Sequence, residues 1–295
     1  MKKISVIGSG TMGNGIAHCF AQKGFEVYLI DISKENLKNA ELKISKNLDR
    51  MIKKELISEE EKKEIISRIH FHNEMGDSVK NSDLVIEAAT ESKDVKLKIF
   101  KELDNLCKAE TILASNTSSI SISEIGSATN REGKVIGMHF MNPVPIMKLV
   151  EVIKGKNTSK ETFEIIMETA EKLNKVPVFV NDAPGFVANR ILMPMINEAI
   201  LTLNQKISGV NEIDTVMILG MSHPMGPLFL ADFIGLDVCL SILNVMHEGF
   251  QDEKYKPCLL LKEMVEKGDL GMKSGKGFYD YSEGVKNKKV SSRFL

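Results

Sequence analysis

The sequence contains few cysteines, few arginines and no long apolar run, and these shortages exclude several classes of protein. Its four cysteines lie far apart and form no C-x-x-C pair, so the spacing of a zinc or thiol-redox site is absent. No apolar run reaches the ~18 residues of a membrane-spanning helix. Only five residues are arginines, and no arginine-rich targeting segment is visible. We therefore expect a cytoplasmic protein with reduced cysteines, no metal and no membrane span.

The positive and negative charges nearly cancel: 39 lysines and arginines stand against 40 aspartates and glutamates, and the net charge is -1. This balance excludes a broadly basic nucleic-acid-binding surface. Hydrophobic residues make up 43% of the chain, enough for a large core, which excludes a disordered protein. A chain of 295 residues predicts about two domains. An anionic ligand would need a local basic patch, because the chain has no overall positive field.

Strand-like and helix-like runs alternate over residues 1–180, and this alternation predicts a mostly parallel sheet covered by helices. Residues 34–68 resemble two charged helices, which is longer than one crossover between parallel strands needs. We therefore predict a Rossmann-like α/β domain with an inserted helical hairpin over residues 1–183. Its expected strands are residues 4–7, 26–30, 69–72, 84–88, 111–114, 135–139, 149–153 and 176–180.

The pattern changes after Asp182, where helix-like segments follow one another with Gly and Pro at the joints. We predict that residues 184–295 form an all-α C-terminal domain. Its expected helices are residues 185–204, 210–220, 226–247 and 257–268.

Residues 8–13 read Gly8-Ser9-Gly10-Thr11-Met12-Gly13 and lie between the first expected strand and the first expected helix. The G-x-G-x-x-G pattern alone is weak evidence, but this context is that of a dinucleotide-binding loop. Gly8 would make the tight turn, Gly10 would let the backbone approach a pyrophosphate, and Gly13 would let helix and strand pack closely. The helix N-terminus would offer N–H groups to the phosphates. The alternative is an ordinary glycine-rich turn.

Asp31 ends the second expected strand, 18 residues after Gly13. An acid about 20 residues after the glycines commonly hydrogen-bonds the ribose 2′-hydroxyl of a bound dinucleotide. The 2′-phosphate of NADP would meet a like charge there, and no arginine follows closely. The sequence therefore predicts NAD as the cofactor, with NADP kept open by Lys34.

A stripe of basic residues lies in the expected hairpin, at steps of three to four residues that place its members on one helix face. From spacing alone, a solvated helix face is the favoured interpretation. The alternative is a site for a phosphorylated ligand such as coenzyme A. The stripe consists of Lys43, Lys46, Arg50, Lys53 and Lys54.

A carboxylate stands where an apolar residue is expected. In a strand over residues 149–153, Glu151 points to the same face as Leu149 and Ile153, and its burial is costly without a partner. His139 ends the preceding strand, and the loop between them turns the chain. Adjacent strands would join the two side chains as a histidine–carboxylate general base. A purely structural ion pair is the alternative.

Two other polar features are ambiguous. Asn189 shares a helix face with Phe186, Leu192 and Met193, and it would bond either a substrate or a neighbouring loop. The segment Ser115-Asn116-Thr117-Ser118-Ser119 follows a strand at its carboxyl end. Ligands of open α/β sheets bind at that edge, but a polar turn with a helix cap has the same composition.

Besides the glycine loop and the serine-rich segment, the sequence contains five further motifs: Gly137-Met138-His139-Phe140-Met141-Asn142-Pro143, Lys148-Leu149-Val150-Glu151, Pro184-Gly185-Phe186-Val187-Ala188-Asn189-Arg190, His223-Pro224-Met225-Gly226-Pro227 and Gly277-Phe278-Tyr279. In this order the motifs resemble the (S)-3-hydroxyacyl-CoA dehydrogenase family, in particular its short bacterial 3-hydroxybutyryl-CoA members. The resemblance runs from residue 4 to about residue 281, and it is to the stand-alone enzymes rather than to those fused to a hydratase domain.

The resemblance implies roles for residues at matching positions. His139 would be the catalytic acid/base with Glu151 as its partner, while Ser118 and Asn189 would bond oxygen atoms of a thioester substrate. Lys54 and Asn47 match positions that meet coenzyme A, which favours the ligand site for the basic stripe. The residues expected at NAD are Gly8, Gly10, Thr11, Met12, Gly13, Asp31, Glu91, Lys96, Asn116, Ser118, Asn142 and Lys273.

The resemblance also implies partners and departures. A coenzyme A thioester would be the substrate, and the helical domain would mediate a homodimer or a higher homo-oligomer. Met141 stands where the family usually has Phe, from which we expect altered packing only. The segment 282–295 has no role in the family.

Two alternatives from other classes remain at this stage. One is a β-hydroxyacid dehydrogenase of the phosphogluconate type, which relies on a lysine in the first helix of its second domain. Residues 185–204 contain no lysine. The other is a dinucleotide-binding protein without activity, which would not need His139 or Glu151.

Overall fold

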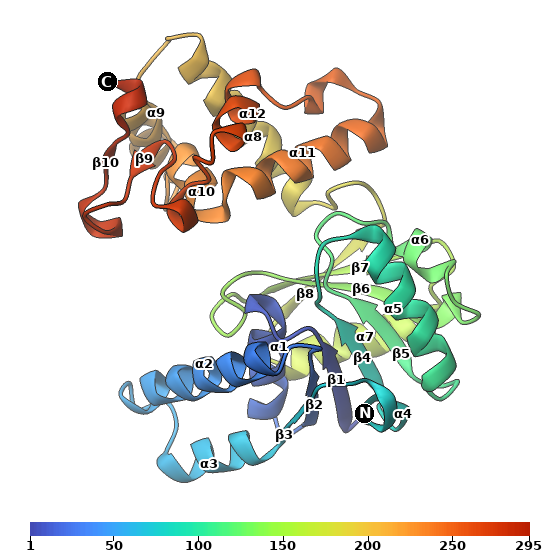
Figure 1. Ribbon diagram of the computed structural model, residues 1–295. Helices are drawn as coiled ribbons and strands as arrows, with labels where there is room; N and C mark the ends of the chain where they lie inside the picture. The colour runs from blue at the N-terminus through green and yellow to red at the C-terminus, as the bar shows by residue number, and fades with distance from the viewer. The chain divides into compact units, whose positions relative to one another are not determined.

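The structure is a computed structural model that describes residues 1–295, and the chain divides into two units, Met1–Ala183 and Pro184–Leu295 (Figure 1). The first unit is built on an eight-stranded sheet of order β3-β2-β1-β4-β5-β6-β7-β8. Neighbouring strands are parallel except β6 and β7, so the expected mostly parallel sheet is confirmed. The strands are β1 (Lys3–Ile7), β2 (Glu26–Ile30), β3 (Ile69–His72), β4 (Leu84–Glu87), β5 (Ile112–Ser115), β6 (Val135–Phe140), β7 (Leu149–Lys154) and β8 (Val176–Asn181).

Helices cover the sheet because its strands are apolar on both faces. One core cluster joins Ile16 and Phe20 with Leu48, Ile166 and alternate strand residues. Val85 and Leu113 point the other way by strand alternation and are fully buried, as is Phe100. The helices of this unit are α1 (Thr11–Gln22), α2 (Lys34–Ile52), α3 (Glu59–Ser67), α4 (Gly76–Lys80), α5 (Lys93–Leu106), α6 (Ile122–Gly126) and α7 (Lys160–Lys172).

The inserted hairpin consists of α2 and α3, which lie side by side in Figure 1. Ser33 caps α2, and Ser58 with Glu61 forms a capping box at the start of α3. α2 ends at Ile52, so Lys53 and Lys54 lie beyond the helix. The expectation that all five basic residues share one helix face is therefore wrong for these two.

The second unit is helical, as expected, around a core that includes Met193, Leu243 and Phe278. The single helix expected over residues 226–247 is two helices, because Gly235 adopts φ +104° between them. The helix expected over residues 210–220 is α-helical only in its first half, and Val216–Gly220 is a π-helical turn. The elements are α8 (Ala188–Asn204), α9 (Val210–Thr215), α10 (Pro227–Ile234), α11 (Leu236–Phe250), α12 (Leu259–Glu266), β9 (Tyr279–Asp280) and β10 (Lys289–Val290).

The segment 282–295 folds back on this helical core, which the sequence did not predict. β10 pairs with β9 in an antiparallel ribbon. The ring of Phe294 stacks on Phe278 with centroids 5.7 Å apart, and Arg293 forms an ion pair with Glu263 at 2.8 Å. These contacts cover Phe278, which is fully buried.

No single helix is long and apolar enough to cross a membrane, although α10 and α11 together pass a length-and-composition test across a 96° bend.

Candidate functional site

The glycine loop follows β1, next to the point where the strand order of the sheet reverses. Gly8 has φ +95°, and a Cβ on it would lie 2.6 Å from the Ala88 carbonyl oxygen. A Cβ on Gly13 would lie 1.7 Å from the Gly8 carbonyl oxygen. Packing within the chain therefore requires both glycines. A Cβ on Gly10, the N-cap of α1, would meet no atom within 4 Å, so the space beside this glycine is open to a ligand.

The edge beside this loop fits a dinucleotide. α1 begins at Thr11 and its N-terminus has no side-chain cap, which leaves N–H groups for a phosphate. The Asp31 carboxylate lies at the loop and accepts hydrogen bonds from the Ser9 N–H, the Ser9 hydroxyl and the Ser33 N–H, at 2.8 to 2.9 Å. Partial burial raises the pKa of Asp31, but these bonds outweigh it and hold the pKa below its usual value. Asp31 is thus a charged acceptor at neutral pH.

His139 and Glu151 face each other across the one antiparallel strand pair. They are register partners in β6 and β7, and His139 Nδ1 lies 2.8 Å from Glu151 Oε2. Both side chains are buried, with residue exposures of 8% and 2%. The predicted adjacency of this histidine and carboxylate is confirmed. A carboxylate at Nδ1 fixes the orientation of the ring and directs proton transfer to Nε2.

A buried charge network supports the serine-rich segment after β5. The Glu87 carboxylate, fully buried at the end of β4, binds the Lys96 ammonium at 2.8 Å and accepts from the Ser115 hydroxyl at 2.7 Å. Lys96 also pairs with Glu91 at 3.4 Å. One Glu91 oxygen accepts from the Ser118 N–H at 2.8 Å and from its hydroxyl at 3.1 Å. Ser118 is therefore held by a chain of charges that begins at Glu87.

Sequence reasoning missed Glu87, although a signal was present. Glu87 ends the apolar run Leu84-Val85-Ile86 of β4, much as Asp31 directly follows the apolar end of β2. The structure places Lys96 at 1% exposure with its ammonium enclosed by two carboxylates. Burial raises the pKa of Glu91, but the Lys96 charge and the hydroxyl and amide donors lower it overall.

Two asparagines lie close to the histidine strand. The Asn116 side chain accepts a hydrogen bond from the Phe140 N–H at 2.9 Å, which ties the serine-rich segment to β6 one residue after His139. Asn142 lies exposed in the loop between β6 and β7. Asn116 is therefore held at the residue after His139, and Asn142 lies three residues after His139 in the loop that leads to the strand of Glu151.

A cavity of about 320 Å³ lies beside the glycine loop. Three basic residues of α2, Lys43, Lys46 and Arg50, line it together with Asn47. α1 contributes Thr11, Asn14 and Gly15, and the loop after β6 contributes residues 142–145. Lys54 is not among the lining residues. The basic patch sought in this neutral protein is therefore concentrated at one cavity, next to Asn142.

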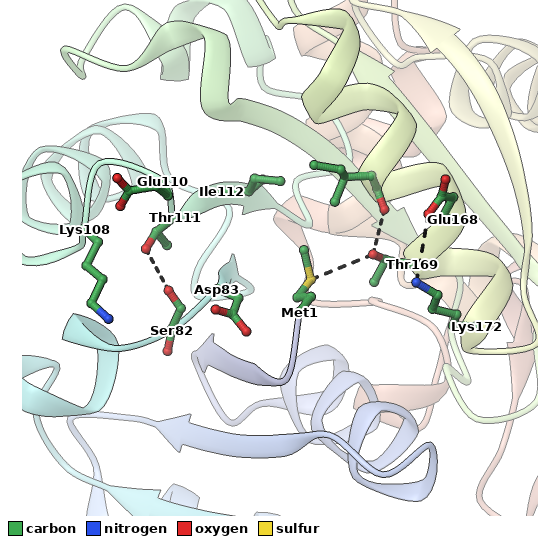
Figure 2. Close-up of a pocket in the computed structure, with 11 residues that line it drawn as sticks. Met1, Ser82, Asp83, Lys108, Glu110, Thr111, Ile112, Glu168, Thr169 and Lys172 are labelled. Atoms are coloured by element: carbon green, nitrogen blue, oxygen red, sulfur yellow. Dashed lines mark hydrogen bonds and ion pairs between the residues drawn. The ribbon is translucent and has the colours of Figure 1, made fainter.

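A second cavity, of about 340 Å³, lies at the opposite edge of the sheet, where β4 and β5 begin (Figure 2). Figure 2 shows its lining to be mixed in charge, with Asp83 and Glu110 near Lys108. It contains none of the residues predicted for the site, so its chemistry is separate from that of the glycine loop.

The remaining predicted residues lie in the second unit. Asn189 is in the first turn of α8 and is buried. Lys273 forms an ion pair with Asp237 and is half-exposed. The expected contacts of these two residues with substrate and cofactor stay predictions.

The second unit also buries two carboxylates. Asp232 accepts from the N–H groups of Phe278 and Tyr279 and from the Tyr281 hydroxyl, at 2.8 to 3.0 Å. Asp214 accepts from the N–H of Leu228 and from the Tyr279 hydroxyl, both at 2.8 Å. Burial raises the pKa of both acids, that of Asp232 to about 6, and neighbouring Asp214 adds to the rise. These acids anchor the segment 278–281 to the helices.

Comparison with known proteins gives the family. The model for the 3-hydroxyacyl-CoA dehydrogenase NAD binding domain matches residues 3–183, and the model for the C-terminal domain of the same family matches residues 185–281. The chain is 52% identical to a probable 3-hydroxybutyryl-CoA dehydrogenase of Bacillus subtilis, over 96% of this chain and 98% of that one. It is also 52% identical to 3-hydroxybutyryl-CoA dehydrogenase of Bradyrhizobium diazoefficiens, over 95% and 96%.

A solved structure agrees in fold. The crystal structure of (S)-3-hydroxybutyryl-CoA dehydrogenase from Ralstonia eutropha superposes with a TM-score of 0.92 at 46% identity, over 96% of this chain and 99% of that one. The resemblance found in the motifs is confirmed: this chain belongs to the 3-hydroxyacyl-CoA dehydrogenase family.

Proposed function

We propose that this protein is an NAD-dependent 3-hydroxybutyryl-CoA dehydrogenase that interconverts (S)-3-hydroxybutyryl-CoA and acetoacetyl-CoA. The observation that carries the proposal is the buried His139–Glu151 pair, at 2.8 Å, on the strands that follow a dinucleotide-binding loop. The printed names of the relatives at 52% identity support the four-carbon acyl group.

His139 moves the proton. In oxidation Nε2 accepts the proton of the 3-hydroxyl group, and in reduction the imidazolium returns a proton to the 3-keto oxygen. Glu151 orients the ring through Nδ1 and stabilises the charge that forms on it. Ser118, held by Glu91, and Asn189 would hydrogen-bond the oxygen atoms of the thioester.

NAD, when bound, supplies the acceptor of the hydride that leaves carbon 3. The chain's part is to hold it: residues 8–13 and the start of α1 fit the pyrophosphate, and Asp31 fits the ribose hydroxyls. Glu91, Lys96, Asn116, Asn142 and Lys273 are proposed as further contacts. The carboxylate at residue 31 favours NAD over NADP, because a 2′-phosphate would be repelled.

Two glycine variants test the cofactor site. Gly10→Ala should raise the Kd for NADH about tenfold or more and change the melting temperature only slightly, because a Cβ at this N-cap meets nothing in the chain. Gly13→Ala should instead lower the melting temperature, since its Cβ would strike the Gly8 carbonyl. NADH fluorescence titration and calorimetry measure the two effects. Unchanged NADH binding by a folded Gly10→Ala variant would contradict the assignment.

The basic cavity supports binding of coenzyme A. Lys43, Lys46 and Arg50 present positive charge to one space, and the phosphates of coenzyme A are anionic. We propose Asn47 as a polar contact at the same place. Lys54 is carried over from the resemblance alone, because it lies past the end of α2 and outside the lining.

The phosphogluconate-type alternative is not favoured, because α8 contains no lysine and the matched family is a different one. A dinucleotide-binding protein without activity would have no use for the buried pair. One assay separates the proposed function from these two alternatives. NADH absorbance should fall when acetoacetyl-CoA is added, and the His139→Gln variant should lower the rate of this fall about 10²- to 10⁴-fold. No fall with either NADH or NADPH would refute the proposed function.

We also propose that the protein acts in the cytoplasm as a homodimer or a higher homo-oligomer. All four cysteines are free and buried, in keeping with a reducing compartment. The helical unit exposes large apolar side chains, among them Ile191, Ile207 and Leu219, each at least 69% exposed. Sedimentation equilibrium measures the assembly directly, and a monomer at micromolar concentration would contradict it.

A further inference from the structure

The loop between β6 and β7 joins the strand of His139 to the strand of Glu151, and it also forms one wall of the basic cavity. Its own backbone makes a turn in which the N–H groups of Ile146 and Met147 both donate to the Pro143 carbonyl at 3.0 Å. The carbonyl groups of Val144 and Met147 point elsewhere, and both accept hydrogen bonds from one side chain.

That side chain is Lys175, which lies in the connection between α7 and β8. Its ammonium donates to the Val144 and Met147 carbonyl oxygens, the second at 2.7 Å, and the residue is only 8% exposed. An ammonium group is expensive to bury unless its N–H donors are satisfied. Charge-assisted hydrogen bonds are also stronger than neutral ones. Both partners that the structure gives to this buried charge are main-chain atoms of the loop.

The loop is seated between this ammonium and α1. A Cβ on Gly15 would lie 2.9 Å from the Val144 Cβ, so α1 presents a flat surface against which Val144 packs. His18, three residues further along α1, is fully buried, and neither of its ring nitrogens has a hydrogen-bond partner. Burial and the nearby Lys175 charge lower the pKa of His18 to about 4, so the ring is neutral at neutral pH. The loop carbonyls, rather than His18, accept the lysine's hydrogen bonds.

We infer that Lys175 is a positioning residue that fixes the loop at residues 142–147. By fixing this loop, it also holds the wall of the proposed coenzyme A cavity and the relative placement of His139 and Glu151. The inference rests on the proposed function for its catalytic consequence. Its structural part, that the loop is ordered by this ammonium, stands on the contacts alone. No sequence pattern pointed to Lys175, since it sits in a polar junction between a helix and a strand.

The test compares two lysine variants near the same helix end. Lys175→Met keeps the length of the side chain and removes the donors, and kcat/KM for acetoacetyl-CoA should fall about 10- to 100-fold, with an increase in KM. Lys172→Met removes an exposed lysine that pairs only with Glu168, and kcat/KM should stay within about twofold. Lys175→Arg, which keeps charge and donors, should recover part of the loss. Loss of folded protein alone would lower the apparent kcat without raising KM.

Hydrogen exchange supplies a measurement independent of activity. In Lys175→Met, the amides of Ile146 and Met147 should exchange at least about tenfold faster than in the wild type, while those of Lys172→Met should not. If Lys175→Met does not fold, Lys175→Gln carries both measurements. A folded variant with wild-type kcat/KM overturns the inference whatever its exchange rates. If the wild-type protein is inactive on acetoacetyl-CoA, the proposed function is refuted. The role of Lys175 in ordering the loop is tested separately: it is refuted if the Ile146 and Met147 amides of Lys175→Met exchange at the wild-type rate.

Discussion

The two units of this chain bury carboxylates in different ways. In the first unit Glu87 is paired with the Lys96 ammonium and Glu151 with the His139 imidazole. In the second unit Asp214 and Asp232 accept hydrogen bonds from backbone N–H groups and tyrosine hydroxyls. Burial raises the pKa of both Asp214 and Asp232, and the negative charge of Asp214 raises the pKa of Asp232 further.

This difference separates carboxylates at the proposed reaction site from carboxylates that hold a segment in place. A carboxylate paired with a basic group can stabilise positive charge that forms beside it, as a proton-transfer site requires. A carboxylate surrounded by neutral donors holds many bonds at once but takes up a proton readily when its pKa is raised. The first arrangement orders Ser118 and His139, and the second ties the segment 278–281 to its helices.

The largest effect is expected from neutralising the acid of the reacting pair. Glu151→Gln keeps the shape but removes the charge that supports protonated His139, and kcat should fall about 10²- to 10⁴-fold with little change in KM. Steady-state kinetics with acetoacetyl-CoA and NADH measure both constants. Wild-type turnover in this variant would show the pair to be structural and would break the comparison.

Removing the cation of the buried network should be the next largest effect. Lys96→Met leaves the buried Glu87 carboxyl group without its ion-pair partner and should lower the free energy of unfolding by about 3–5 kcal/mol, measured with urea. The double variant Glu87→Gln with Lys96→Met removes both charges and should recover most of that loss. If Lys96→Met is no less stable than Asp232→Asn, the two arrangements do not differ in the way proposed.

The pH dependence of the helical unit should have the opposite sign from that of the first unit. Because the folded pKa of Asp232 is about 6, above its ordinary 3.8, its contribution to stability is full below pH 4 and is lost as pH rises to about 6. The loss amounts to about 3 kcal/mol. Glu91, whose pKa is lowered, contributes above its ordinary pKa and loses that contribution as pH falls.

Calorimetry of the wild type and Asp232→Asn between pH 4.5 and 7.5 measures the contribution of the helical unit. The variant should gain stability relative to the wild type as pH rises through about 6. Parallel curves for the two proteins would show that Asp232 does not titrate in this range.

The smallest effect is expected from one hydroxyl. Tyr281→Phe removes one donor from Asp232 and should lower the free energy of unfolding by about 1–2 kcal/mol at pH 7.5. The loss should shrink at pH 5, because the bond is stronger to a charged acceptor. Equal losses at the two pH values would indicate that the carboxyl group has the same charge at both.

Much of the fold followed from apolar periodicity. Short runs of apolar and β-branched residues marked all eight strands of the first sheet to within one residue at either end, including β8, which is mostly exposed. The facing of His139 and Glu151 followed from the two-residue period of a strand. Breaks in helices were less visible: Gly235 could have continued a helix, and only its observed φ of +104° shows that it does not.

The parts of the site that the sequence did not show are those assembled by distant residues. Glu87 reaches Ser115 across 28 residues, and Lys175 reaches Val144 across 31. No local pattern records such a contact, since the residues lie on different strands or junctions. The basic stripe was predicted correctly only in part. Lys43, Lys46 and Arg50 line one cavity, but the end of α2 at Ile52 could not be located in the sequence because charged residues continue past it.

The antiparallel hairpin of β6 and β7 also bears on how the site forms during folding. His139 and Glu151 are 12 residues apart, whereas parallel neighbours in the sheet require crossovers through a helix. Closing a short loop loses less chain entropy than closing a long one. The pair proposed for proton transfer therefore depends only on a local hairpin, whereas the dinucleotide loop and Asp31 come together through parallel strands joined by helical crossovers.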